Sequence, residues 1–283
     1  MIPTIPQPRA VRVAYAAYVA LFFVYLALPL TVVAVFAFND SQFPSLPWDG
    51  FTWNWFFGDE RPMIGVFHER SIMRAIGTSI FVATCVSVLS VAVGLSNAFL
   101  FNRYQFRGKG LLYVIMLLPL VIPGIVLGIS ILVFSSTMAN AAWDTVGIDL
   151  QSLRPGLPLV VLGQFSFIAT IATLVISARL QKFDRTLEDA ALNLGASRLT
   201  AVRTITIPFL APAMIGALVV AFLMSFENFN TTLMLVGSDA PLTIAMFDRL
   251  KEGSTPLLNA VSLLLMLGSS LLALVMILFQ RSR

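Results

Sequence analysis

Charged residues are scarce in this chain: Asp, Glu, Lys and Arg together make up 11% of its 283 residues. Soluble globular domains carry about 25%. Hydrophobic residues reach 58% here, and the mean hydropathy is +0.89. So few polar side chains cannot cover the surface of a water-soluble fold. The composition therefore predicts an integral membrane protein.

Cysteine and histidine are nearly absent. The one cysteine, Cys85, excludes an intramolecular disulfide, and the one histidine, His68, leaves no histidine-based metal cluster, so we predict no metal site. The phosphate-loop pattern GxxxxGK[ST] is also missing, because RGKG at 107–110 lacks both its spacing and its Ser or Thr. We therefore expect the chain to bind no nucleotide and no other cofactor, and not to be an enzyme.

Long apolar runs are what the sequence has in abundance. A membrane-spanning helix needs about 20 mostly apolar residues, and six runs meet that length. The first exceeds the apolar part of a signal peptide, about 7–15 residues, so we interpret it as a retained span. The predicted fold is all-α, a single integral membrane domain over 1–283 with six transmembrane helices at 13–38, 72–101, 111–136, 158–179, 209–235 and 257–280.

The distribution of basic residues predicts how these spans are oriented. Twelve of the 18 Lys and Arg residues lie in or next to 1–12, 102–110, 180–208 and 281–283. Basic residues mark the cytoplasmic side of a membrane, so we expect both termini and the stretch 180–208 in the cytoplasm. The net charge of +4 then follows from topology and requires no nucleic acid as a partner.

The third apolar run contains helix-breaking residues at close intervals, in LLPLVIPGIVLGIS. Pro119, Pro123 and Gly124 free backbone groups, which a membrane tolerates only where neighbouring protein or a water-lined cavity satisfies them. We predict that these three residues form a gate or kink on a transport path. A kinked helix that serves packing alone is an equal alternative.

A charged stretch, LEDAALNLGASRLTAVRTITIPFLAP at 187–212, interrupts the apolar runs on the predicted cytoplasmic side. Thr186 predicts a helix cap, and Gly195 predicts a turn. Ser197 predicts the cap of a second short helix that ends before Pro208. The stretch is thus predicted to present alanines and acids to the cytosol. An amphipathic hairpin lying on the lipid is the alternative.

The spacing in this stretch resembles the EAA loop of ABC-importer permeases, which reads Glu-Ala-Ala, three residues, Gly, nine residues, Ile-x-Leu-Pro. Here Asp189-Ala190-Ala191, Gly195 and Ile205-Thr206-Ile207-Pro208 follow at those intervals, with Asp for Glu and Ile for Leu. In that family the loop inserts into a separate ATPase subunit and transmits its closure to the spans. The resemblance implies a MetI-like permease fold and an ATPase-coupling surface made of Glu188, Asp189, Ala190, Ala191 and Gly195.

The resemblance covers residues 14 to 280. NRYQFRGKG at 102–110, LLPLVIPGIVLGISIL at 117–132 and LTIAMFDRLKEGSTPLLNAVS at 242–262 look like the polyamine branch of type I ABC-importer permeases. This implies a bacterial inner-membrane location and a homologous permease subunit, expected as a heterodimer. It further implies two ATPase subunits that use ATP and Mg, and a periplasmic substrate-binding protein.

Glu227, in MSFENFNTTLM, is the one acidic residue within a predicted span. A carboxylate there costs about 2.5–3.5 kcal/mol on insertion scales, so it should face a wet path or a partner charge. Asn228 and Asn230 add amides, and Phe226 and Phe229 offer ring faces to a cation. We predict that these five residues line a substrate path for an ammonium group. A protonated or helix-bridging Glu227 is the structural alternative.

The sequence therefore predicts the permease subunit of an ATP-driven importer for a polyamine such as spermidine or putrescine. The same importer class with another cargo is the main alternative: an opine, a γ-aminobutyrate-like amino acid, an aminophosphonate or ferric iron. A secondary carrier that uses Glu227 as a proton or sodium site is less favoured, because six spans without an inverted repeat are few for such a carrier. A membrane enzyme is disfavoured, because the sequence offers no nucleophile–base pair.

Overall fold

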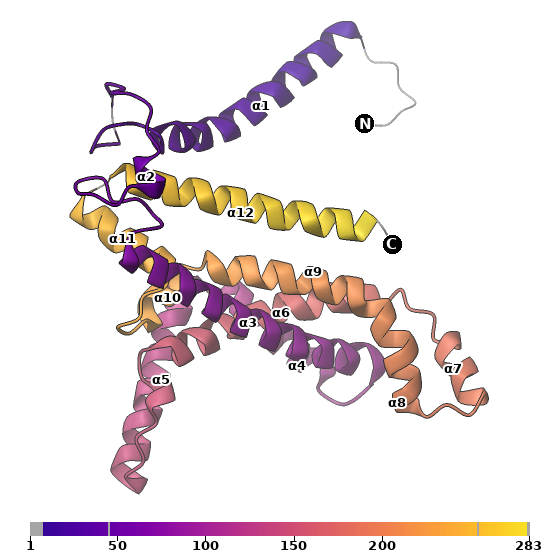
Figure 1. Cartoon of the computed structure of the whole chain (residues 1–283). Coiled ribbons are helices and arrows are strands. Elements are labelled where there is room, and N and C mark those ends of the chain that lie inside the picture. Colours follow the sequence, from indigo (N-terminus) through magenta and orange to yellow (C-terminus); the bar gives the residue numbers. More distant parts are fainter. Residues whose placement is uncertain (1–7, 45, 254, 282–283) are drawn as a thin grey trace. The chain divides into compact units, whose positions relative to one another are not determined.

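A computed structural model of the protein describes residues 8–44, 46–253 and 255–281, most of which are helical (Figure 1). Within these residues, six helices are long and apolar enough to span a membrane, which confirms the all-α, six-span prediction. They are α1 (Arg9–Phe36), α3 (Arg70–Arg103), α5 (Gly124–Val146), α6 (Leu157–Leu180), the continuous run Arg198–Phe226 and α12 (Pro256–Arg281). The shorter helices are α2 (Asn54–Phe57), α4 (Lys109–Val121), η1 (Gln151–Leu153), α7 (Thr186–Asn193), α10 (Asn230–Leu235) and α11 (Leu242–Glu252). Residues 1–7 and 282–283 of the predicted cytoplasmic termini lie outside the described residues.

The described residues fall into two compact units, one within 1–70 and 249–268 and the other within 71–248 and 269–283. The first unit contains an aromatic cluster after α1. The ring of Phe38 stacks on that of Phe51 with centroids 5.0 Å apart. The buried Trp55 donates its indole N–H to the backbone carbonyl of Asn39 at 2.9 Å. The aromatic-rich segment after the first span thus folds on itself.

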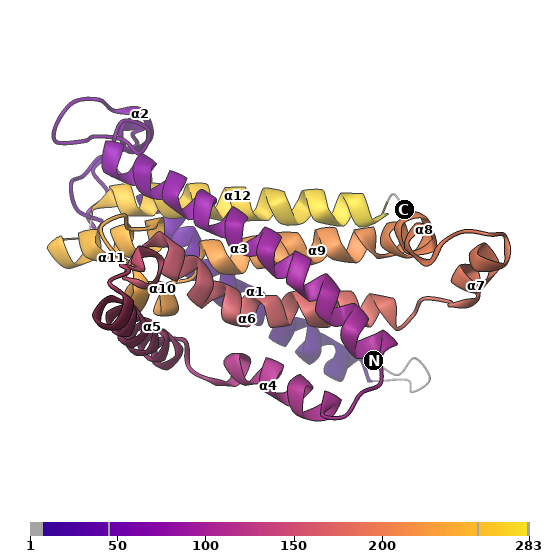
Figure 2. The same ribbon diagram turned by 90° about the horizontal axis from the view of Figure 1, so that it is seen from below.

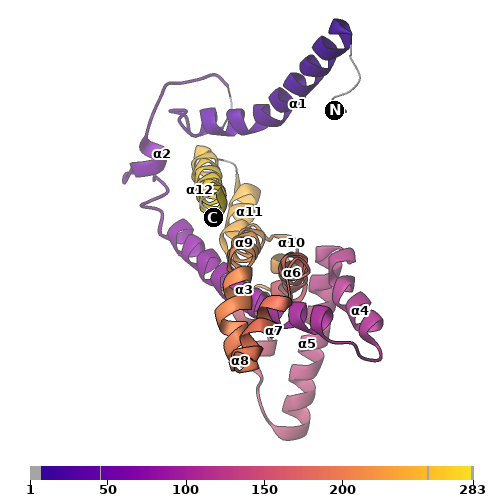
Figure 3. The same ribbon diagram turned by 90° about the vertical axis from the view of Figure 1, so that its right-hand side faces the viewer.

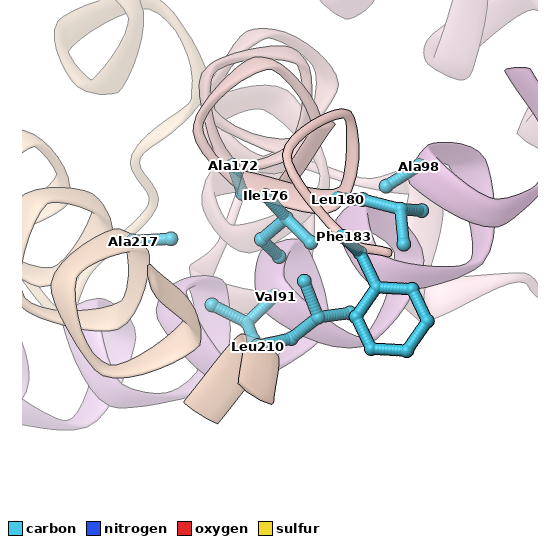
Figure 4. Close-up of a cluster of buried hydrophobic side chains, with 8 residues drawn as sticks. All are labelled: Val91, Ala98, Ala172, Ile176, Leu180, Phe183, Leu210 and Ala217. Atoms are coloured by element: carbon cyan, nitrogen blue, oxygen red, sulfur yellow. The ribbon is translucent and has the colours of Figure 1, made fainter. Parts of the chain in front are cut away.

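The core of the second unit forms where α3, α6 and α9 (Ile207–Phe226) pack together. A Cβ placed on Gly94 of α3 would lie 2.9 Å from the Cβ of Ala172 on α6, so the approach of these helices requires glycine. Apolar side chains from the three helices and from the segment after α6 fill this core (Figure 4): Val91, Ala98, Ala172, Ile176, Leu180, Phe183, Leu210 and Ala217. The cluster lies at the end of the helices that carries the predicted coupling loop.

Two groups of helices lie at opposite ends of α6 and α9. α7 and the short helix α8 (Arg198–Ala201) lie at one end, and α5 and α10 lie at the other (Figures 1 and 2). Figure 3 is seen from the first end, with α7 and α8 toward the viewer. The predicted coupling loop and the predicted substrate residues are therefore separated by α9, which has 20 residues and so a length of about 30 Å.

The third span is not the single helix predicted over 111–136. The helix breaks after α4, and α5 then continues to Val146, beyond the predicted end. Ile122 is extended, with φ −76° and ψ 130°, because a residue before proline is disfavoured in the helical region. Pro123 in turn lacks the N–H that would continue the helix. The predicted kink is thus a complete break.

The fifth span is also interrupted, so the prediction of one helix over 209–235 is wrong. α9 ends at Phe226, and α10 begins at Asn230. Neither proline nor glycine lies between them. The side-chain carbonyl of Asn228 accepts the backbone N–H of Thr232 at 3.2 Å, and this satisfies a donor that the start of a new helix leaves free. Residues 227–229 are called the α9–α10 break below.

The second short helix of the coupling loop does not end before Pro208, contrary to the prediction. α8 continues through a π-helical turn, η2 (Val202–Thr206), directly into α9. Pro208 follows this π-helical turn directly, and such local adjustments allow a membrane helix to accommodate a proline. Ser197 caps α8 as predicted, accepting the N–H of Thr200 at 3.1 Å. The prediction that Thr186 caps the first short helix is wrong, because Thr186 is the first residue of α7 and Arg185 occupies the cap position without a side-chain cap bond.

Candidate functional site

The α9–α10 break exposes Glu227, the residue directly after α9. Its carboxylate makes no hydrogen bond or ion pair with any residue that the structure describes. Phe226 and Phe229 on either side are half-buried, and the ring of Phe229 packs edge-on against that of Phe247 in α11 with centroids 4.9 Å apart. Asn230 is exposed. The predicted path residues thus combine an open carboxylate and amide with packed aromatic rings.

Asn228 holds the α9–α10 break in its bent conformation. Its side-chain carbonyl accepts the hydroxyl of Thr232 at 3.0 Å, in addition to the N–H of the same residue. Its backbone carbonyl accepts the hydroxyl of Thr243, in α11, at 3.1 Å. Because both carbonyls of Asn228 are engaged, the backbone next to Glu227 is fixed from two directions.

Gln164 in α6 connects the two sides of the break, and it was absent from the predicted site. Its side chain is buried, with 1% of the residue exposed. The amide Nε2 donates to the hydroxyl of Thr232 at 2.8 Å, and Oε1 accepts the hydroxyl of Ser225. Ser225 precedes the break and Thr232 follows it, so one amide spans both. The signal in the sequence was a long amide within the apolar run 158–179, where a polar side chain needs a protein partner.

The breaks in the third and fifth spans lie against each other. A Cβ placed on Gly124, the first residue of α5, would lie 3.1 Å from the Cβ of Asn230. The carbonyl of Gly124 accepts the hydroxyl of Thr231 at 3.3 Å. Pro123 is exposed beside Gly124, and Pro119 lies within α4. A predicted gate residue and a predicted path residue are thus in contact.

The coupling loop, residues 180–208, presents an apolar surface at the opposite end of α9. Leu194 is 89% exposed and Leu199 is 68% exposed. Asp189 and Ala190 are exposed as well. Gly195 has φ +89°, a conformation that side chains disfavour, and it makes the turn between α7 and α8. Large exposed apolar groups next to polar ones are typical of a protein-contact surface.

Glu188 differs from the other predicted coupling residues. Arg103, at the end of α3, binds both oxygens of its carboxylate at 2.9 Å, and each of the two side chains is 15% exposed. Ala191, on the same helix, is half-buried.

Just before α7, hydrogen bonds from the backbone and side chain of Thr186 lower the pKa of Asp184 below its ordinary 3.8. This exposed carboxylate therefore stays charged at neutral pH.

Comparisons of the sequence with known proteins identify a family and relatives. Residues 90–282 match the family described as "Binding-protein-dependent transport system inner membrane component". The chain is 30% identical over 266 residues to the spermidine/putrescine transport system permease protein PotC of Haemophilus influenzae, with 92% of this chain and 93% of PotC covered. It is 27% identical over 247 residues to the putrescine transport system permease protein PotI of Escherichia coli, with 86% and 82% covered.

A solved structure shares the fold at much lower identity. The crystal structure of a bacterial ABC transporter involved in the import of the acidic polysaccharide alginate aligns with a TM-score of 0.70 at 14% identity, with 96% of this chain and 94% of that chain covered. At this identity the structural likeness shows the fold alone. The sequence matches, which cover most of the chain, show the family. This chain therefore belongs to the family of inner-membrane components of binding-protein-dependent transport systems.

Proposed function

We propose that this chain is the permease subunit of an ATP-driven importer and that its cargo is a polyamine such as spermidine or putrescine. PotC and PotI, whose names state these cargoes, align with most of the chain. Both cargoes carry ammonium groups along a flexible apolar chain. A path for them needs a carboxylate for the charge and apolar or aromatic walls for the methylene groups.

The observation that carries the cargo proposal is the exposed carboxylate of Glu227 at the α9–α10 break. It has no partner among the described residues, so its charge is available to a ligand. The faces of Phe226 and Phe229 attract cations, and the amide of Asn230 adds hydrogen-bonding groups. An anion would be repelled by the same carboxylate. The arrangement therefore favours an ammonium cargo over an anionic one.

ATP hydrolysis by separate ATPase subunits would act on the coupling loop, at the other end of α9. The sequence lacks a phosphate-binding loop, so ATP and Mg would be bound by two partner ATPase subunits. The docking surface on this chain would consist of Asp189, Ala190, Ala191 and Gly195 with the exposed leucines of the coupling loop. A homologous permease would complete the path as a heterodimer, and a periplasmic binding protein would deliver the cargo. Both termini would then lie in the cytoplasm.

The test is uptake of labelled spermidine by proteoliposomes that contain the assembled complex and its binding protein, with wild-type permease or Glu227→Gln. A hydrogen bond to a charged group contributes about 1.5–3 kcal/mol, and each 1.4 kcal/mol is tenfold. We therefore expect the KM of uptake to rise about 10- to 100-fold in Glu227→Gln. Assembly and basal ATP hydrolysis should be unchanged. Glu60→Gln, which neutralises an exposed acid in the segment after α1, is the matched control and should transport normally.

If Glu227→Gln takes up spermidine with the wild-type KM, this carboxylate does not bind the cargo. The proposal of polyamine transport would be unaffected by that result. If the wild-type complex takes up no spermidine or putrescine, the cargo proposal is wrong. The opine, γ-aminobutyrate-like, aminophosphonate and ferric-iron alternatives would then be compared as competitors. Uptake that stops with an uncoupler, but not with ATP depletion, would favour a secondary carrier.

A further inference from the structure

Arg103 and Glu188 form a two-pronged ion pair between the end of α3 and the first turn of α7. Nη1 donates to Oε2 and Nη2 to Oε1, both at 2.9 Å. Each side chain is 15% exposed, whereas the side chains of the pair Arg74–Asp239 are 80% and 45% exposed. Parallel hydrogen bonds between a guanidinium and a carboxylate fix distance and direction together. The pair therefore joins two elements that are 85 residues apart in sequence.

Aromatic rings hold the guanidinium of Arg103 in place. Its central carbon lies 5.9 Å from the ring centroid of Phe99 and 5.5 Å from that of Phe183. Phe183 belongs to the buried cluster between α3, α6 and α9 (Figure 4), and its ring packs edge-on against that of Phe209 at 5.2 Å. Arg103 is thus connected to the core of the spans as well as to the coupling loop.

Two further contacts complete the junction. The hydroxyl of Thr206, in the π turn η2, donates to Oε1 of Glu188. Thr206 is completely buried. The guanidinium of Arg185, just before α7, donates to the backbone carbonyl of Asn102 at 2.9 Å. Glu188 therefore links α7 to α3 through Arg103 and to the start of α9 through Thr206.

We infer that Arg103 is a positioning residue that transmits movement of the coupling loop to α3 through its ion pair with Glu188. This inference rests on the proposed function, because it presumes that an ATPase moves the loop. A displacement of α7 pulls on α3 mainly through this two-pronged pair, because the bond from Arg185 to the carbonyl of Asn102 is a single contact. Glu188 accordingly serves an internal junction, while Asp189 and Ala190 remain exposed for the ATPase.

The inference predicts that loss of the pair uncouples ATP hydrolysis from transport. The experiment uses the complete complex in proteoliposomes with loaded binding protein, and measures molecules of spermidine imported per ATP hydrolysed. We expect Arg103→Gln and Glu188→Gln to assemble and hydrolyse ATP while this ratio falls. Coupling between sites usually amounts to about 5- to 150-fold, so the ratio should fall at least about fivefold. Arg103→Lys, which keeps the charge but lacks the planar fork, should give an intermediate ratio.

Arg107→Gln is the matched control, because Arg107 is exposed four residues after Arg103. Its ratio should equal that of the wild type. A wild-type ratio in Arg103→Gln would overturn the inference. If Arg103→Gln fails to assemble, the ratio measured for Glu188→Gln tests the inference instead, since its amide keeps the shape of the carboxylate. A wild-type ratio in Glu188→Gln would then overturn the inference. A wild-type complex without any ATP-driven uptake would instead contradict the proposed function.

Discussion

The α9–α10 break is held by neutral groups, whereas the junction at the end of α3 is held by an ion pair. At the break, the amide of Gln164 bridges the hydroxyls of Ser225 and Thr232. At the junction, the guanidinium of Arg103 binds the carboxylate of Glu188. Both are polar clusters in an apolar protein, and both connect segments that are distant in sequence.

The difference follows from where each cluster lies. Gln164 is buried among spanning helices, where a fixed charge is costly and a hydrogen-bonded amide is affordable. Arg103 and Glu188 lie at the helix ends beside a charged loop, where partial exposure lowers the cost of charge. A neutral network can hold a backbone bend without competing with Glu227 for a cation. The two parallel hydrogen bonds of the ion pair fix distance and direction, so the pair can transmit a displacement of α7 to α3. The two clusters therefore suit different tasks.

Among variants of the residues that support the break and the coupling loop, the largest effect is predicted for Gln164→Leu, which removes the bridge across the break. The buried hydroxyl of Ser225 then loses its acceptor, whereas that of Thr232 keeps its bond to Asn228. A buried hydroxyl without its partner costs about 1–3 kcal/mol, and this cost falls on the conformation that presents Glu227. The apparent affinity falls with the population of that conformation, so we expect the KM of spermidine uptake to rise at least about tenfold. Uptake kinetics in proteoliposomes measure this.

Ser166→Ala is the matched control for Gln164→Leu, because among the described residues the hydroxyl of Ser166 bonds only to the carbonyl of Gly163 on its own helix, at 2.7 Å. It should leave the KM within about twofold of the wild type, as expected for an interaction of less than 0.5 kcal/mol. Equal KM values for Gln164→Leu and wild type would mean that the amide network does not position the break.

A smaller effect is predicted for Gly124→Ala, which disturbs the contact between the two broken spans. The new Cβ would lie 3.1 Å from the Cβ of Asn230 and 3.3 Å from the hydroxyl oxygen of Thr231. Overpacking of this kind costs about 1–3 kcal/mol, and α10 must shift to relieve it. We expect the maximal rate of uptake to fall severalfold while the assembled complex is retained.

Gly77→Ala, in α3, gives the comparison for Gly124→Ala, because a Cβ there meets nothing within 4 Å. Within a helix, alanine is favoured over glycine by about 0.5–1 kcal/mol. Its maximal rate should match the wild type, and its thermal stability should be equal or slightly higher. A similar decrease in the maximal rate of uptake in both variants would show that the contact between Gly124 and α10 has no particular effect on transport.

The smallest effect is predicted for Ser197→Ala, which removes the cap of α8 in the coupling loop. Loss of a serine cap costs about 1 kcal/mol. We expect a modest decrease in the thermal stability of the complex and little change in the KM, since the cap lies at the far end of α9 from Glu227. Ser197→Asp, which keeps a capping oxygen, should restore the stability. A fall in stability with Asp as large as that with Ala would contradict a capping role.

Local patterns in the sequence predicted the six apolar runs and the coupling loop, because hydropathy and residue spacing are local properties. The break at Pro123 was also signalled locally, although its completeness was not. The shift of the third span to α5 followed from that break, since α4 has 13 residues and a span needs about 20.

Contacts between distant segments could not be predicted in the same way. The fifth span breaks without proline or glycine, because Asn228 and Gln164 satisfy the backbone and hydroxyl groups around the bend. The orientation of the Glu188 side chain depends on its ion pair with Arg103, which lies 85 residues earlier. Adjacent acids in the sequence, Glu188 and Asp189, thereby face different surroundings. Only the packed helices reveal which acid is bound and which is exposed.

The most direct test of the account measures two quantities in the same proteoliposomes: the KM of spermidine uptake and the spermidine imported per ATP. Gln164→Leu should raise the KM and leave the ratio at its wild-type value. Arg103→Gln should lower the ratio and leave the KM at its wild-type value. If each variant instead changes both quantities together, the two polar clusters do not have separate tasks, and the account is contradicted.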